Sequence, residues 1–180
     1  MIQTLKIFRY STFSKNFTQM RFLVFFSVLF IISELRSQDV KMLDLDNGFR
    51  DLHFGDSLSR MSDMKIIDQA EDSTYIFCRK INDNLKFADA DVDLVYTFYK
   101  RQLATVFIQT KGQENSRKVL KYLESRYGKG GQEDRYLYNF FWNGQYTRLT
   151  YHEHVISYDA KVYISSLVYR KVYKAPEKQE

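Results

Sequence analysis

The strongest β-sheet signal in the chain is Asp93-Leu-Val-Tyr-Thr-Phe-Tyr-Lys-Arg-Gln-Leu-Ala-Thr-Val-Phe-Ile108. β-Branched and aromatic residues dominate this stretch on both sides of Lys100-Arg101, and such residues favour strands. The two basic residues interrupt the apolar pattern where the chain has to reverse. We therefore predict a β-hairpin with strands over 93–99 and 102–108 and a two-residue turn at Lys100-Arg101.

Asn143-Gly144 predicts a second hairpin, because this dipeptide is the strongest short turn signal. With a two-residue loop, Trp142 faces Gln145 and the even-numbered aromatic residues before the turn share one face with Leu149 and Tyr151. That face is expected to be core. The opposite face of the returning strand then carries Arg148, Thr150, His152 and His154.

Two helices are expected. The clearer one begins at a Ser116 cap and ends before Gly128, with an apolar stripe made by Val119, Leu120, Leu123 and Tyr127. A shorter helix is predicted after Asp56-Ser57, where Leu58, Met61 and Met64 recur every three residues. Further strands are predicted over 74–79 and from 162 toward 173.

These elements predict an α+β fold, an antiparallel sheet with one or two helices packed on one face, formed by a single domain over residues 38–174. The segments Thr97–Val106 and Phe140–Leu149 both place an aromatic residue before the reversal and a glutamine after it. Two interpretations stay open. Either a helix-plus-hairpin unit is used twice, or the two hairpins are independent.

The N-terminal region has the pattern of a secretory signal. Basic residues precede the apolar run Phe22–Ile32, which at eleven residues is shorter than the roughly 17 to 25 that a membrane-spanning helix needs. We predict a signal peptide over 1–37, cut between Ser37 and Gln38. Residues 1–19 are either part of it or a misplaced start, since Met20-Arg21 would itself open a compact signal; an uncleaved anchor is the alternative.

After cleavage the protein is expected to be periplasmic or secreted, with no stable membrane span. We predict that residues 39–47 form a polar segment without regular structure before the domain, and that residues 175–180 form a disordered tail. The leader holds five of the 27 Lys and Arg but only one of the 22 Asp and Glu, which leaves 22 basic and 21 acidic residues. A nearly neutral domain gives no reason to expect a nucleic-acid partner. The lone Cys78 is expected to be a small core residue.

Chemistry-bearing motifs are few. His152-Glu153-His154 places two histidines two apart on a strand, where both could contact one metal ion, although a further ligand would be needed. No catalytic residues and no cofactor are predicted. We expect a non-catalytic exported or envelope module that binds a protein or other ligand through Arg148, Thr150, His152 and His154. The alternative is a metal-dependent hydrolase that uses His152 and His154.

Several short motifs carry a resemblance. They are Phe49-Arg-Asp-Leu-His-Phe-Gly-Asp-Ser57, Tyr96-Thr-Phe-Tyr-Lys100, Gly112-Gln-Glu-Asn-Ser116, Tyr127-Gly128 and Trp142-Asn-Gly144. With these motifs the chain resembles a group of uncharacterised exported proteins of Gram-negative bacteria. The resemblance implies export, and it implies no activity or catalytic residue. A protein partner in the cell envelope is expected from the binding hypothesis.

Overall fold

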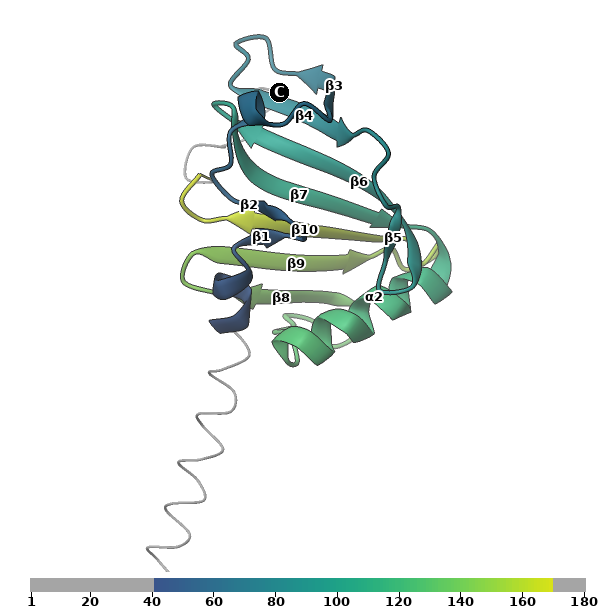
Figure 1. Ribbon diagram of the computed structural model, residues 1–180. Helices are drawn as coiled ribbons and strands as arrows, with labels where there is room; N and C mark the ends of the chain where they lie inside the picture. The colour runs from purple at the N-terminus through teal and green to yellow at the C-terminus, as the bar shows by residue number, and fades with distance from the viewer. Residues whose placement is uncertain (1–40, 170–180) are drawn as a thin grey trace, which may run out of the picture. The chain divides into compact units, whose positions relative to one another are not determined.

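The structure is a computed structural model that describes residues 41–169. The predicted leader at 1–37 and tail at 175–180 lie outside the described residues. Within that range eight strands form one sheet, in the order β3-β4-β6-β7-β10-β9-β8 with β5 paired to β6, and every pairing is antiparallel (Figure 1). The elements are β1 (Gly48–Phe49), β2 (Leu52–His53), a 3-10 helix (Leu58–Arg60), β3 (Met64–Gln69), β4 (Tyr75–Lys80), β5 (Lys86–Phe87), β6 (Ala90–Tyr99), β7 (Gln102–Thr110), α2 (Gly112–Tyr127), β8 (Asn139–Asn143), β9 (Thr147–Glu153) and β10 (Ala160–Ser166).

The predicted hairpin over 93–108 is confirmed as β6 and β7. Tyr99 pairs with Gln102, so the turn consists of Lys100 and Arg101. Both have positive φ, 48° and 64°, as a two-residue turn that matches the twist of the strands requires. The pairing shifts after Thr97, where the partner strand carries one extra residue.

The second hairpin is present as β8 and β9, but its predicted register is wrong. Trp142 pairs with Leu149 and Asn143 with Arg148, four residues further along than a two-residue loop would give. The loop over 144–147 is longer because its backbone N–H groups bind a distant side chain. Asp44 accepts hydrogen bonds from the N–H groups of residues 145, 146 and 147 at 2.6, 2.8 and 2.9 Å.

The offset of four residues is even, so each residue of β9 keeps the face that the sequence predicted. Leu149 and Tyr151 are fully buried and belong to the same core cluster as Phe140 and Trp142. Not all the even-numbered aromatic residues before the turn belong to this face, because β8 begins at Asn139 and the Tyr136 side chain is 74% exposed.

Helix α2 ends where expected but begins earlier. Gly128 follows its last residue with φ 75°. The predicted cap, Ser116, lies inside the helix, where its buried hydroxyl is 2.6 Å from the Tyr158 carbonyl oxygen. The start at Gly112 is stabilised by Asp159, whose carboxylate accepts the Gly112 N–H at 2.8 Å. The cap is thus provided by a segment 47 residues away in the chain.

The predicted helix after Ser57 is wrong beyond a single turn. Only Leu58–Arg60 is helical, as a 3-10 helix, and Met61 has extended φ and ψ angles. Met64 instead begins β3, which pairs with β4 along the edge of the sheet. Three-residue spacing of apolar side chains does not distinguish a helix from a turn followed by an edge strand.

The polar lead-in predicted for 39–47 is also corrected, because residues 41–46 are helical. Leu43 is 1% exposed within the core cluster. Burial by itself raises the pKa of the Asp46 carboxyl, but hydrogen bonds from Arg126 and Tyr127 outweigh it and hold that pKa below its usual value. Arg126 Nε lies 2.8 Å from the Asp46 carboxylate.

The strand at 74–79 is confirmed as β4. The strand from 162 is confirmed as β10, but it ends at Ser166, and residues 167–169 are a turn rather than its predicted continuation toward 173. The two hairpins are preceded differently within 41–169, because β3 to β5 come before β6 whereas α2 comes before β8. A repeated helix-plus-hairpin unit is therefore not seen there. Cys78 is a fully buried core residue, as predicted, and burial raises the pKa of its thiol.

A hydrogen-bonded network lies where α2 meets β9. Arg117 Nη2 on the helix donates to Glu153 at 2.9 Å, and the Tyr151 hydroxyl donates to the same carboxylate at 2.6 Å. Burial first, and then Glu153, raise the pKa of Tyr151 above its usual range.

In the part of the chain that the structure describes, no helix has the length and apolar character to cross a membrane.

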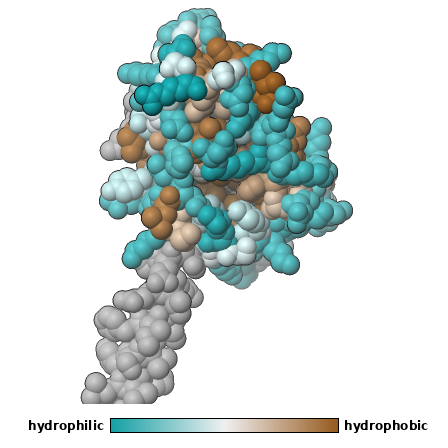
Figure 2. Space-filling model, viewed as in Figure 1, coloured by the Kyte–Doolittle hydropathy of each residue, from teal (hydrophilic) through white to brown (hydrophobic). Residues whose placement is uncertain are grey.

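The surface seen from the side of Figure 1 is mainly hydrophilic, with hydrophobic side chains in separate patches (Figure 2). Apolar side chains that are more than half exposed include Leu45, Ile81, Val155 and Ile156. Val155 and Ile156 are neighbours in one loop, whereas Leu45 and Ile81 lie in other segments, so their exposure by itself assigns no binding surface.

Candidate functional site

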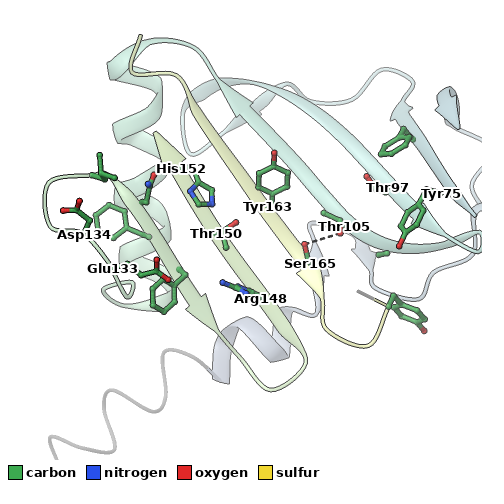
Figure 3. Close-up of a pocket in the computed structure, with 17 residues that line it drawn as sticks. Tyr75, Thr97, Thr105, Glu133, Asp134, Arg148, Thr150, His152, Tyr163 and Ser165 are labelled. Carbon is green, nitrogen blue, oxygen red and sulfur yellow. Dashed lines mark hydrogen bonds between the residues drawn. The ribbon is translucent and has the colours of Figure 1, made fainter. Parts of the chain in front are cut away.

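A pocket of about 620 Å³ opens on the sheet, and its lining reaches from β4 to β8 (Figure 3). This volume falls within the range of about 300–1,000 Å³ that is typical of small-molecule sites. We call it the sheet pocket. Its lining residues are Tyr75, Phe77, Thr97, Ala104, Thr105, Glu133, Asp134, Leu137, Asn139, Phe140, Phe141, Arg148, Thr150, His152, Tyr163, Ser165 and Tyr169.

Strand β9 contributes Arg148, Thr150 and His152 to the sheet pocket. They alternate with Leu149 and Tyr151, which are fully buried in the core, because successive side chains of a strand point to opposite faces. Figure 3 shows the three in a row along the strand. The structure thus places them together on the face away from the aromatic core, as the alternation predicted.

The centre of the pocket is aromatic with interspersed hydroxyl groups. Thr150 is flanked in register by Phe141 on β8 and Tyr163 on β10. The Tyr163 ring packs against Phe107 with ring centroids 5.0 Å apart. Next to Tyr163, Ser165 accepts a hydrogen bond from the Thr105 hydroxyl at 3.2 Å (Figure 3). This surface can bind an apolar group and still offer hydroxyl groups to a polar substituent.

One wall of the pocket is the loop between α2 and β8, which supplies Glu133, Asp134 and Leu137. The loop is held on β8 by Gly131, which exchanges two backbone hydrogen bonds with Phe141 at 2.8 and 2.9 Å. A Cβ atom on Gly131 would lie 2.6 Å from the Phe141 ring. This close approach requires glycine, so the wall and the aromatic centre of the pocket are positioned together.

Arg148 has no partner in the described part of the chain. Its side chain makes no hydrogen bond or ion pair with any residue of 41–169, and its Nε atom is buried without an acceptor. The acidic side chains that line the pocket, Glu133 and Asp134, lie at the same end of it as Arg148 (Figure 3), yet form no ion pair with it.

His154 is separated from the residues of the sheet pocket. It follows the last residue of β9 and is not among the lining residues. Its Nδ1 atom lies 3.2 Å from the Ser157 backbone N–H, within its own loop. His152 lines the pocket and is exposed. Among residues 41–169, no three or more His, Cys, Asp or Glu side chains gather in a way that could hold a metal ion.

Several residues of the sheet pocket were not identified from the sequence. Phe141 and Tyr163 have the alternation that places them beside Thr150, but only the strand order makes them its neighbours. Glu133 and Asp134 lie in a polar loop with no motif that could have predicted their position.

The arrangement provides a concave aromatic surface, two carboxylates on one wall and a guanidinium group without a partner among the described residues. Such a site can bind a molecule, and among the described residues the Ser and Thr hydroxyls of its lining form no hydrogen bond to His152, Glu133 or Asp134. Comparison of the chain with protein-family models, with curated proteins and with solved structures finds no match.

Proposed function

We propose that this protein is an exported, non-catalytic module that binds a small ligand in the sheet pocket. In this proposal the leader directs export, α2 covers one face of the sheet, and the other face receives the ligand. The observation that carries the proposal is the pocket of about 620 Å³ with its aromatic centre. A walled cavity of this size fits a small molecule better than the surface of a folded protein partner.

Binding is favoured over the hydrolase alternative by the positions of the histidines. A zinc hydrolase needs three protein ligands around an open coordination position. His152 is in the sheet pocket, whereas the Nδ1 atom of His154 faces its own loop, and no third ligand stands beside them in residues 41–169. These positions support binding as the function of this face.

Binding is tested with N-phenyl-1-naphthylamine, a neutral dye whose fluorescence rises in apolar surroundings. The variant Thr150→Phe fills the centre of the pocket, between Phe141 and Tyr163. We expect the affinity for the dye to fall at least about tenfold, the effect of losing roughly 1.4 kcal/mol of binding free energy.

The matched control is Gln109→Phe, which adds the same ring to a strand residue outside the pocket lining. It should leave the dye affinity unchanged. Equal affinities in wild type, Thr150→Phe and Gln109→Phe would show that the dye binds elsewhere, and the proposal would then fail.

Export is tested separately by expressing the chain in a Gram-negative bacterium. We expect the protein in the periplasmic or culture fraction, with an N-terminus at Gln38. Recovery of the full-length chain in the cytoplasm would refute this part of the proposal without affecting the pocket.

A further inference from the structure

Arg148 differs from Arg117, the other partly buried arginine of the described chain. Arg117 pairs with Glu153, and the more exposed Arg50 and Arg126 also each pair with a carboxylate, Asp83 and Asp46. Arg148 is also partly buried and lines the sheet pocket, yet no carboxylate of residues 41–169 pairs with it.

An unpaired guanidinium in this position is costly to the folded protein. Removing a charge from water is unfavourable unless an opposite charge or hydrogen-bond acceptors compensate for it. The Arg148 Nε atom is buried without any acceptor. A ligand that brings an anionic group to Arg148 would recover this loss, because the planar guanidinium fits a carboxylate or phosphate with two parallel hydrogen bonds.

The surroundings of Arg148 favour an anion of single charge with an apolar body. Glu133 and Asp134 also line the pocket and would repel a doubly charged group more strongly than a singly charged one. Phe141 and Tyr163 offer aromatic surface next to the row that contains Arg148. A molecule with a carboxylate at one end and an acyl or aromatic body satisfies both features.

We propose that the sheet pocket binds small amphiphilic monocarboxylates, with the carboxylate on the guanidinium of Arg148 and the apolar body on Phe141 and Tyr163. This inference rests on the proposed function, because it specifies the ligand class of the same pocket.

The test measures displacement of N-phenyl-1-naphthylamine by dodecanoate and by dodecanol, which have the same apolar chain and differ in the carboxylate. Only the dye fluorescence that is lost in Thr150→Phe is taken as binding in the sheet pocket. For wild type we expect dodecanoate to displace the dye at a concentration at least about ten times lower than dodecanol, since a hydrogen bond to a charged group is worth about a factor of ten or more. In Arg148→Met this preference should vanish, while dye and dodecanol bind as before.

Arg60→Met is the matched control, because Arg60 is exposed and outside the pocket. It should retain the full preference for dodecanoate. Arg148→Met is also expected to unfold at the same or a higher urea concentration than wild type, because it removes a charge without a partner. Marked destabilisation would assign Arg148 a structural role and overturn the proposal, as would equal displacement by dodecanoate and dodecanol in wild type.

Displacement by dodecyl phosphate, which carries the same apolar chain and a doubly charged group, tests the preference for a single negative charge. If dodecyl phosphate displaces the dye at lower concentration than dodecanoate, the preference for a single negative charge is wrong. If the dye shows no signal that Thr150→Phe removes, the proposed function itself fails. If the dye binds but dodecanoate has no advantage, the pocket stands and only the anion inference fails.

Discussion

Replacing Asp44 by alanine should loosen the hairpin between β8 and β9 and destabilise the domain. Its carboxylate accepts three backbone N–H groups, from Gln145, Tyr146 and Thr147, at 2.6 to 2.9 Å. A carboxylate that joins residues about 100 positions apart holds both the helical turn at 41–46 and the loop at 144–147. The substitution removes all three acceptors at once.

The expected loss follows from the exposure of the three donors. The bonds from Gln145 and Tyr146 are exposed, so water can replace the carboxylate and each loss costs about 0.5–1 kcal/mol. The Thr147 N–H is partly buried, and leaving it unsatisfied costs about 1–3 kcal/mol. Alanine regains about 0.5 kcal/mol through its higher helix propensity. The free energy of unfolding should therefore fall by about 2–4 kcal/mol, and by about half of that in Asp44→Asn, which keeps an acceptor oxygen.

Urea unfolding followed by tryptophan fluorescence measures this loss. Trp142 is the sole tryptophan of the chain and lies on β8, with 3% of its surface exposed. The midpoint for Asp44→Ala should fall by about 1–2 M urea at an unchanged slope. Glu71→Ala removes an exposed carboxylate in the turn before β4 and should change the midpoint little. A loss below about 0.5 kcal/mol for Asp44→Ala would refute the argument that Asp44 determines the loop.

The other predictions concern buried charge, acid stability and the central turn. Glu153→Ala leaves a helix arginine and a buried hydroxyl without their acceptor and should lower the free energy of unfolding by about 2–4 kcal/mol in the same urea assay. The pKa of Asp46 in the folded state is below its unfolded value of 3.8. The ionised carboxylate therefore stabilises the folded state fully above pH 3.8, and this stabilisation is lost as the pH falls through the lowered pKa. In Asp46→Asn the free energy of unfolding should accordingly fall less steeply between pH 4 and 2. The double substitution Lys100→Asn and Arg101→Gly supplies residues that tolerate the positive φ angles of this turn, so the thermal midpoint should rise; a fall would contradict the turn geometry.

The sequence predicted the elements whose signal is local. The hairpin of β6 and β7 follows from two β-rich runs around a two-residue reversal, and the end of α2 follows from Gly128. The faces of β9 were also predictable, because alternation depends on the strand alone and survives an even shift in register. Arg148, Thr150 and His152 were accordingly placed on the right face.

Several of the elements that were wrong depend on partners far away in the chain. The start of α2 is set by Asp159, 47 residues away in the chain. The strand β3 was missed for a different reason, since its partner β4 follows directly but the three-residue apolar spacing also fits a helix. The wall of the sheet pocket requires Gly131 to pair with Phe141, which no local pattern indicates. His154 is a local exception: the strand ends one residue before it, and its Nδ1 atom accepts a hydrogen bond from the Ser157 N–H three residues on.

By itself the sequence determined that the chain forms an antiparallel hairpin sheet with a helix and which side chains share a face, because strand alternation and turn geometry act over a few residues. Only the tertiary structure decided the strand order, the register at residues 144–147 and the absence of a carboxylate partner for Arg148 among the described residues. These features depend on groups such as Asp44 and Asp159 satisfying backbone N–H groups up to about 100 residues away. Whether Arg148 lacks an acidic partner is therefore a property of the fold, and it is this property that suggests an anionic ligand.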